Sequence, residues 1–205
     1  MSHRDVDAAR PDVSEHSETE SFGDLGEGIR LRPLLAGDGE ELAAAYSRNR
    51  AHLAPWEPLR SAEFFTAARQ HRLIAEALRA VADGRSAAYV LEDGEHRIVG
   101  RANLSDIVRG AFWSAHLGYW IDGRLAGRGL MRRAVDMVCA LARDDLGLHR
   151  VQAATLVHNE ASQRVLRATG FTQIGPAPRY LRIAGEWQDH VLFQRILEDA
   201  AASTA

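Results

Sequence analysis

The sequence predicts an α/β domain with a mixed sheet, and two observations support that prediction. Short apolar segments of the kind that form strands alternate along the chain with longer segments whose apolar residues recur at helical spacing. An interleaved order of strands and helices is typical of α/β proteins. The length of 205 residues, 46% of them hydrophobic and 26% charged, corresponds to one globular domain with enough material for a core and a tail.

The two ends of the chain are expected to lie outside this domain. Residues 1–27 are rich in Asp, Glu, Ser and Gly and hold almost no large apolar residue. Such a segment cannot bury enough surface to offset the entropy lost on ordering, so we expect a disordered acidic tail. The domain is expected to span residues 28–197, and residues 198–205 are expected to form a flexible C-terminus.

The first half of the domain is predicted to contain a strand and two helices. Residues 29–34 alternate apolar side chains with arginine, which is typical of a strand. Asp38-Gly39 is expected to open the first helix. A second helix is predicted over residues 61–83, where apolar positions recur near helical spacing until Gly84 ends the pattern.

The second half is predicted to contain a hairpin, further strands and two more helices. Residues 87–91 and 97–104 are expected to pair around Asp93-Gly94, a strong hairpin signal. An amphipathic helix is expected to begin near Leu130 and to end before Gly147. The remaining predicted elements are strands at 112–121, 151–157, 171–174 and 191–196 and a short helix at 159–170.

Charge and cysteine content narrow the class of protein. A formal net charge of -3 argues against a protein built to coat nucleic acid. The single cysteine, Cys139, permits no intrachain disulfide and fits a reducing compartment. The sequence shows no secretory signal and no run of the ~20 apolar residues that a membrane span needs. We therefore expect a cytoplasmic protein with no membrane partner, and the nine histidines show no metal-ligand spacing.

A glycine-rich turn precedes the amphipathic helix. Gly127-Arg128-Gly129 lies between a predicted strand and Leu130, and glycines there let the backbone approach a ligand closely. The first N–H groups of a helix have no internal partner and lie at the positive end of its dipole. The turn therefore suits a phosphate or pyrophosphate, although ordinary turn chemistry also explains it. It is neither a P-loop nor a good Gly-x-Gly-x-x-Gly match, since residue 132 is Arg.

Asn159 lies where a predicted strand ends and a helix begins. A helix N-cap is a sufficient reason for Asn at such a position. Ligands of open α/β sheets also favour the carboxyl edge of the strands, so the amide can serve a ligand as well. The sequence leaves both interpretations open.

Seven short segments spread over about residues 28–197 are each unspecific, but their order and spacing together are specific. They are Asn49-Arg50-x-His52-Leu53-x-Pro55-Trp56, Gly118-Tyr119-Trp120-Ile121-Asp122, Gly127-Arg128-Gly129-Leu130-Met131, Leu146-Gly147-Leu148-His149-Arg150-Val151, Asn159-x-x-Ser162, Gly170-Phe171 and Gly185-Glu186-Trp187-Gln188-Asp189-His190. In this order and spacing they resemble the GNAT superfamily of acetyltransferases, and more narrowly its RimJ/RimL branch. The resemblance implies one GNAT-like domain with a mixed, mostly antiparallel central sheet flanked by about four helices.

The resemblance implies acetyl-CoA as co-substrate and assigns residues to it. Backbone N–H groups from Gly127 through Arg128 and Gly129 to Leu130 would hold the pyrophosphate, and the strand edge at Trp120 and Ile121 would pair with the pantetheine arm. Asn159 would reach the same arm, and Ser162 is the candidate to protonate the leaving thiolate.

The phosphate motif of the family is Gln/Arg-x-x-Gly-x-Gly/Ala, and this chain departs from it. In register with the helix, the first and last positions are Ala126 and Met131. Arg124-x-x-Gly127-x-Gly129 fits by letters but lies two residues out of register, so we prefer the helix register.

The expected reaction is acetylation of a primary amine by direct attack in a ternary complex. The amine must be neutral, which at pH 7 costs roughly 1–1.4 kcal/mol for an α-amine and about 4.6 kcal/mol for lysine. An α-amine, of a protein N-terminus or an amino-acid-like molecule, therefore needs only weak help from a base. RimL-like proteins can carry Glu before a Tyr-Leu pair where this chain has Arg179. His116 and Tyr119 are the candidate bases, and plain strand packing also explains them.

Three other functions compete with this prediction. The chain can acetylate an amine-bearing antibiotic, regulate a partner as a non-catalytic acyl-CoA-binding module, or bind a nucleotide. Pro55-Trp56 and Phe112-Trp113 are candidate walls of an acceptor pocket, and packing explains them equally well. The acceptor and the oligomeric state stay open, with a homodimer among the possibilities.

Overall fold

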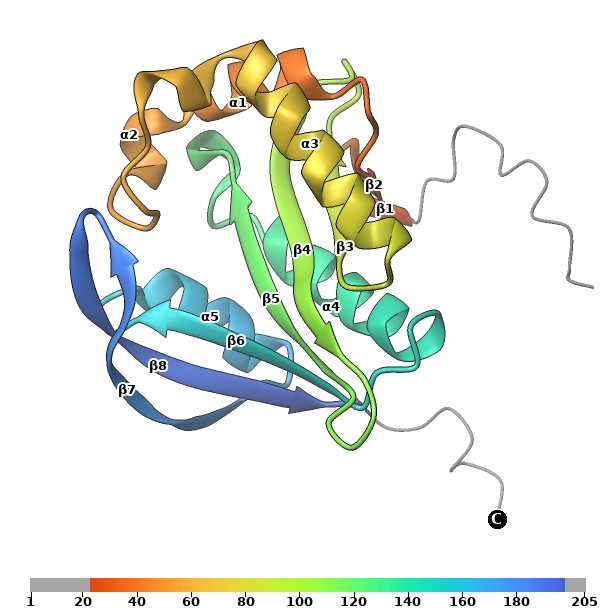
Figure 1. Ribbon diagram of the computed structural model, residues 1–205, viewed down its shortest axis with the longest axis vertical. Coiled ribbons are helices and arrows are strands. Elements are labelled where there is room, and N and C mark those ends of the chain that lie inside the picture. The colour runs from red at the N-terminus through yellow and green to blue at the C-terminus, as the bar shows by residue number, and fades with distance from the viewer. Residues whose placement is uncertain (1–22, 198–205) are drawn as a thin grey trace, which may run out of the picture.

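The computed structural model describes residues 23–197, which form one eight-stranded sheet with helices on both faces (Figure 1). The strands are β1 Gly23–Gly26, β2 Ile29–Pro33, β3 Ala87–Glu92, β4 Ile98–Val108, β5 Ser114–Ile121, β6 Arg150–Leu156, β7 Thr172–Ile183 and β8 Glu186–Ile196. The α-helices are α1 Gly39–Arg48, α2 Arg50–Leu53, α3 Ala67–Ala82, α4 Leu130–Asp144 and α5 Glu160–Ala168, and two 3₁₀ turns are η1 Ala62–Phe65 and η2 Gly123–Leu125.

The strand order is β1-β2-β3-β4-β5-β6-β8-β7, and all neighbours are antiparallel except β5 and β6. Parallel pairing joins Ser114–His116 to Arg150–Gln152 and then stops. Beyond these residues the two strands diverge like the arms of a V (Figure 1). The prediction of an α/β domain with a mixed, mostly antiparallel sheet and about four main helices is confirmed.

The sheet separates two apolar cores because successive side chains of a strand point to opposite faces. On one face, Leu42 and Tyr46 of α1 and Ile74 of α3 pack with Val90 and Ile98 of the sheet. On the other face, α4 and α5 cover the sheet with a larger core. Strand β3 is buried along its whole length, because helices cover both of its faces.

Helix α4 forms as its apolar periodicity predicts. Leu130, Ala134, Val138 and Ala142 are almost fully buried along one stripe against the sheet. Cys139 belongs to the same buried face, and burial raises the pKa of its thiol to about 11. The thiol is therefore a core group and not a reactive nucleophile.

The structure corrects the predicted boundary of the acidic tail. Residues 23–26 form β1, which pairs with β2, and Leu25 is completely buried in the core. The tail therefore does not extend to residue 27, because a single apolar side chain and a strand edge suffice to anchor four residues. The rest of the predicted tail, residues 1–22, and the predicted flexible C-terminus at 198–205 lie outside the described residues.

The last two strands are much longer than predicted. The sequence predicted strands at 171–174 and 191–196, whereas β7 and β8 form a long hairpin that turns at Ala184-Gly185. Most of β7 is exposed and it contains Pro176 and Pro178, so its apolar alternation is weak. A strand held by pairing with β8 leaves little trace in side-chain pattern.

Two further facts bear on the class of protein. None of the helices within residues 23–197 has the length and apolar character needed to cross a bilayer. Within the same residues, no three His, Cys, Asp or Glu side chains lie together in a group able to hold a metal ion.

Candidate active site

The divergence of β5 and β6 opens a gap in the middle of the sheet. From Leu117 to Ile121, β5 pairs with β4 on one side and has no strand partner on the side of β6. Backbone N–H and C=O groups need partners unless water or a ligand supplies them. The free edge of β5 can therefore pair with an extended ligand.

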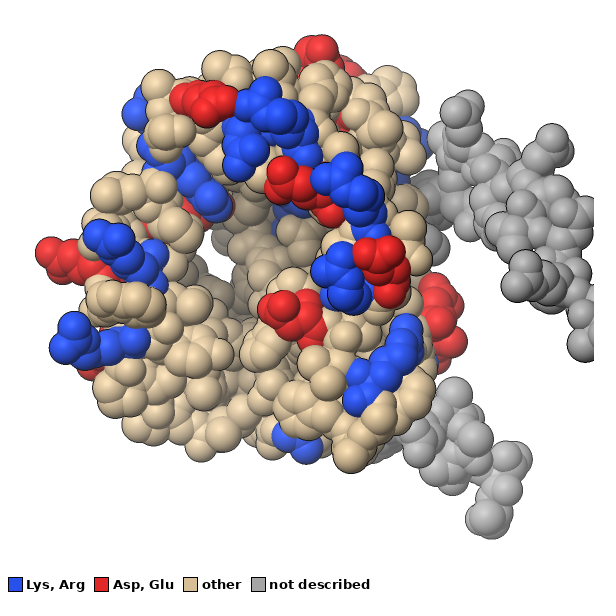
Figure 2. Space-filling view, viewed as in Figure 1, with Lys and Arg blue, Asp and Glu red and all other residues tan. Residues whose placement is uncertain are grey.

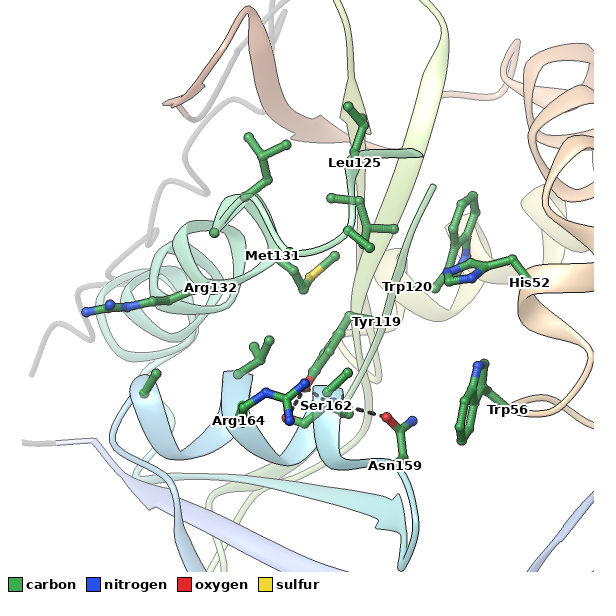
Figure 3. Close-up of a pocket in the computed structure, with 18 of the residues that line it drawn as sticks. His52, Trp56, Tyr119, Trp120, Leu125, Met131, Arg132, Asn159, Ser162 and Arg164 are labelled. Atoms are coloured by element: carbon green, nitrogen blue, oxygen red, sulfur yellow. Dashed lines mark hydrogen bonds between the residues drawn. The ribbon is translucent and has the colours of Figure 1, made fainter. Parts of the chain in front are cut away.

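A cavity of about 510 Å³ lies at this gap on the α4 and α5 face, and we name it the α4–α5 cavity (Figure 3). Its walls come from the end of β5, the turn before α4, the first turn of α4 and the exposed side of α5. Trp120, Ile121, Gly127, Gly129, Leu130 and Asn159 all line it, as the sequence predicted for the donor site.

The turn before α4 has the geometry that a phosphate-binding turn needs. Gly127 and Gly129 have φ angles of +79° and +78°, which side chains rarely tolerate. Gly129 is the N-cap of α4, and the first intrahelical bond of this turn runs from the N–H of Arg133 to the carbonyl of Gly129 at 3.2 Å. The preceding N–H groups therefore remain available at the positive end of the helix dipole. Helix α4 begins at Leu130, as the sequence predicted.

The side chains of the arginines around this turn make different contacts. Arg132 lines the α4–α5 cavity, whereas the side chain of Arg128 pairs with Glu27 at 3.1 Å. Arg124 donates to Asp122 at 3.0 to 3.1 Å and does not line the cavity. Arg128, alone among the residues assigned to the donor, does not line the cavity, and its side chain is paired with Glu27.

Helix α5 and strand β5 bring two hydroxyl groups together. The phenol oxygen of Tyr119 lies 2.8 Å from Oγ of Ser162 and 3.2 Å from the Ser162 carbonyl oxygen (Figure 3). Oδ1 of Asn159 accepts the N–H of Ser162 at 3.1 Å, so the predicted N-cap is confirmed. Burial raises the pKa of Tyr119, and the Ser162 hydrogen bond opposes this only in part. At neutral pH the phenol keeps its proton and suits a hydrogen-bond donor rather than a base.

The other predicted site residues lie elsewhere. His116 lines neither of the cavities described here, because it lies at the closed end of the gap, where β5 still pairs with β6. Phe112 and Trp113 are exposed in the loop between β4 and β5, where Arg150 and Arg109 lie over their rings. Neither of these side chains lines either cavity, whereas Trp56 lines both.

A second cavity of about 390 Å³ lies on the α1 face, and we name it the hairpin cavity because the β7–β8 hairpin closes it. Figure 2 shows the molecule hollowed between the helices above and the hairpin. Trp56, Tyr119, Trp120, Asn159 and Ser162 line both cavities, so the two meet at the gap. The Tyr119–Ser162 pair therefore stands where two ligands from opposite faces would touch.

The hairpin cavity contains polar residues that sequence reasoning missed. Glu57, Arg101, Asn103 and His190 line it from three separate parts of the chain: the loop after α2, strand β4 and strand β8. Glu57 follows Trp56 directly, and Asn103 and Arg101 alternate along β4, so strand periodicity was the available signal. Only the tertiary structure shows that these positions face one space.

A glycine turn that presents helix N–H groups, a free strand edge and a pair of hydroxyl groups meet in one gap. The residues present fit a CoA thioester: the turn suits its diphosphate, the edge of β5 its amide-bearing arm, and the hydroxyl pair its sulfur. Fold and site together define an acyltransferase that takes its acyl group from CoA.

Comparison with known proteins specifies this class. The sequence model of the acetyltransferase (GNAT) domain matches residues 29–172. The [Ribosomal protein uS5]-alanine N-acetyltransferase of Escherichia coli is 36% identical over 158 residues, which cover 76% of this chain and 80% of that protein. The crystal structure of the ribosomal-protein-S5-alanine acetyltransferase from Vibrio fischeri superposes with a TM-score of 0.83 and 37% identity, covering 88% of this chain and 98% of that one.

A structure of Mycobacterium smegmatis RimJ in complex with CoA-disulfide has a TM-score of 0.79, 27% identity and 84% coverage of both chains. The chain belongs to the GNAT acetyltransferase family, and its relatives lie in the RimJ/RimL branch. It is an N-acetyltransferase that uses acetyl-CoA, as the sequence predicted, and neither a regulatory module without chemistry nor an antibiotic-modifying enzyme is favoured.

Proposed function

We propose that the enzyme acetylates the α-amine of a protein N-terminus, and that an alanine-starting ribosomal protein is its acceptor. The relatives at 36% and 37% identity are named for an alanine of ribosomal protein uS5 or S5. The observation that supports an acceptor of this kind is the Tyr119–Ser162 pair, which lines both cavities at their junction. An amine that enters through the hairpin cavity meets there a thioester held in the α4–α5 cavity.

The proposed donor site uses the backbone from Gly127 to Leu130 for the diphosphate and the free edge of β5 at Trp120 and Ile121 for the pantetheine arm. The amide of Asn159 caps α5 through Oδ1, and its nitrogen remains able to donate to that arm. Acetyl-CoA supplies the activated acyl group when bound; the chain supplies its orientation.

The proposed chemistry divides between the two sides of the gap. The neutral amine nitrogen attacks the carbonyl carbon, and a backbone N–H of β5 near Trp120 stabilises the charge on the carbonyl oxygen. As the carbon–sulfur bond breaks, the Tyr119–Ser162 pair donates a hydrogen to the sulfur. Because the pKa of Tyr119 is raised, the phenol is protonated at neutral pH and the pair can donate.

The proposal is tested by an acceptor screen that measures CoA thiol release and the mass of the peptide. A peptide with alanine at its N-terminus should be acetylated once, and the same peptide with a blocked N-terminus and an internal lysine should remain unmodified. The enzyme contains no lysine, so lysine self-acetylation cannot confuse the assay. Equal rates on both peptides would reject the α-amine assignment.

Ser162→Ala tests the proposed hydrogen donor. We expect kcat to fall roughly 10- to 100-fold, at the lower end of general acid catalysis because Tyr119 remains. The affinity for acetyl-CoA, measured by calorimetry, should change less than threefold. Ser105→Ala, an exposed serine on β4, is the matched control and should have wild-type kinetics. A Ser162→Ala enzyme with wild-type kcat would remove Ser162 from the mechanism.

Location and assembly complete the proposal. We propose a cytoplasmic enzyme, since its relatives are named for ribosomal-protein substrates. A homodimer is compatible with the site, because both cavities are built within one chain. Light scattering and cell fractionation test these two statements.

A further inference from the structure

Glu57 presents a fixed carboxylate to the hairpin cavity. It follows Trp56, which lines both cavities, and its side chain is 19% exposed. The backbone carbonyl of Glu57 accepts the N–H of Ala184 at 3.0 Å, which ties this loop to the tip of the β7–β8 hairpin. The backbone that carries this carboxylate is therefore held against a segment far away in the sequence.

Glu57 has little hydrogen bonding of its own among residues 23–197. Its carboxylate receives one long hydrogen bond, from Nε of Arg60 at 3.4 Å, and the Arg60 guanidinium also lies over the Phe64 ring. Burial raises the pKa of Glu57, and the charges of Arg60 and Arg101 offset this only in part. A partly buried carboxylate with one weak partner can still accept strong hydrogen bonds from a cation in the cavity.

Other residues that line the hairpin cavity also have polar groups with few hydrogen-bond partners. Nε of Arg101 is buried without a hydrogen-bond partner, and its Nη atoms reach Tyr46 and Asn103 only at 3.5 Å and 3.4 Å. Oγ1 of Thr155 in the same cavity is also buried without a partner. Buried polar groups are normally satisfied, so this cavity is built for a ligand that carries oxygen acceptors as well as a cation.

We propose that Glu57 binds the α-ammonium group of the acceptor and takes its proton, while Arg101 holds the oxygen of the first peptide group. This inference rests on the proposed function and names the chemistry of its acceptor site. One N–H bond of the ammonium breaks and its proton passes to the carboxylate, directly or through one water. The nitrogen lone pair then forms the C–N bond as the C–S bond breaks, and the sulfur takes a proton from the Tyr119–Ser162 pair. The nitrogen releases its second proton, which returns through water to that pair, so that the amide product is neutral.

His190 is the competing proton acceptor in this cavity. It is buried in β8, and Nδ1 lies 2.9 Å from the carbonyl oxygen of Gln188, so Nδ1 carries the hydrogen and Nε2 is free to accept one. A neutral imidazole does not attract an ammonium group as a carboxylate does. The other charged or titratable groups facing Glu57 are Arg60, Arg101 and the phenols of Tyr46 and Tyr119.

Glu57→Gln tests the proposal with an alanine-starting peptide. We expect kcat/KM near pH 7 to fall about 100-fold or more, the range for loss of a general base. Acetyl-CoA affinity and the melting temperature should remain those of the wild type. Glu57→Asp should recover part of the activity. Glu63→Gln, which removes an exposed carboxylate paired with Arg72, is the matched control and should be fully active.

The pH profile separates a chemical role from a structural one. Wild-type kcat/KM should fall as the pH drops through the raised pKa of Glu57, because the protonated carboxyl cannot accept a proton. In Glu57→Gln this limb should be replaced by one at the pKa of the amine, about 7.7–8.0, because only the amine that is already neutral can then react. An acid limb that survives in Glu57→Gln but is lost in His190→Gln would overturn the proposal in favour of the imidazole.

A measurement on the wild-type enzyme remains decisive if Glu57→Gln does not fold. With CoA bound, a peptide that lacks only its α-amine should bind at least tenfold more weakly than the alanine peptide. Equal binding, or a Glu57→Gln enzyme within threefold of wild-type kcat/KM, would overturn this inference alone. A wild-type enzyme that acetylates no α-amine would instead overturn the proposed function and this inference with it.

Discussion

Gly129 shows how one backbone angle decides what the donor site can bind. A φ of +78° at the N-cap turns the chain so that the free N–H groups of α4 face the α4–α5 cavity. A Cβ at this position would approach Nη1 of Arg133 to 3.3 Å, a side chain that can move. The requirement for glycine therefore lies mainly in the angle and in the space left for an anion.

Gly129→Asp should weaken acetyl-CoA binding roughly 10- to 100-fold, about 1.4–2.8 kcal/mol, because it adds strain and a negative charge at the anion site. Isothermal titration measures the change. Gly110→Asp is the matched control: Gly110 has a φ of +74°, an added Cβ there meets nothing within 4 Å, and it lines neither cavity. Equal losses in both variants would mean that strain alone is responsible.

At this scale the sequence could predict some site residues and not others. Asn159 and Gly129 carry local signals, since a cap and a turn each depend on neighbouring residues. The contact between Tyr119 and Ser162 joins residues 43 positions apart, so only packing reveals it. His116 had the chemistry of a base, but it lies where β5 still pairs with β6 and lines neither cavity.

At the scale of elements, Asp122 joins the helical layer to the turn that precedes α4. Its carboxylate is 1% exposed and accepts hydrogen bonds from Arg48 of α1, from Asn49 and from Arg124. Asn49 in turn accepts the N–H of Gly123 at 3.0 Å. Burial alone would raise the pKa of Asp122, but these hydrogen bonds outweigh it and hold the pKa well below its usual range.

Asp122→Asn should lower the free energy of unfolding at pH 7 by roughly 2–3 kcal/mol, since it weakens several charged hydrogen bonds at once. A lowered pKa contributes stability above the ordinary value of 3.8 and loses it as the pH falls through the folded-state pKa. The difference in the free energy of unfolding between the wild type and the variant should therefore become smaller below about pH 4. Urea unfolding at pH 7 and pH 3 measures it.

The control for this prediction is Asp144→Asn, an exposed carboxylate whose partner is the adjacent Arg143. It should leave the urea midpoint unchanged at both pH values, because exposed pairs contribute little. An Asp122→Asn protein as stable as the wild type at pH 7 would show that the two layers do not depend on this carboxylate.

Most elements could be predicted because their apolar periodicity records which face is buried. Helix α4 and the β3–β4 hairpin begin and end within a few residues of the predicted bounds. Strand β1 and most of β7 escaped prediction because pairing, rather than a buried face, holds them. Leu25 is the one side chain of β1 that is completely buried, too little to form a pattern.

At the scale of the whole molecule, only three residue pairs join β5 to β6 across the middle of the sheet. The half that carries β1 to β5 and the half that carries β6 to β8 are otherwise held by helices α4 and α5, which pack on the shared core. A donor bound in the α4–α5 cavity contacts both halves, since its walls come from β5 and from α5.

Saturation with acetyl-CoA at about 100 times its dissociation constant should therefore raise the melting temperature by roughly 5–10 °C. Differential scanning fluorimetry measures the shift. ATP and NAD at the same concentration should give clearly smaller shifts, because they lack the pantetheine arm that pairs with β5. Protection by ATP equal to that by acetyl-CoA would contradict the donor assignment.

The divergence of β5 and β6 also affects how substrates bind and products leave. A continuous sheet would separate its two faces; this sheet is open between β5 and β6, and a cavity reaches that opening from each face. Free CoA can leave past α4 while a large acetylated protein is still bound on the other face. We therefore expect either product to depart first, so that CoA can be exchanged for a new acetyl-CoA before a bulky folded target has left.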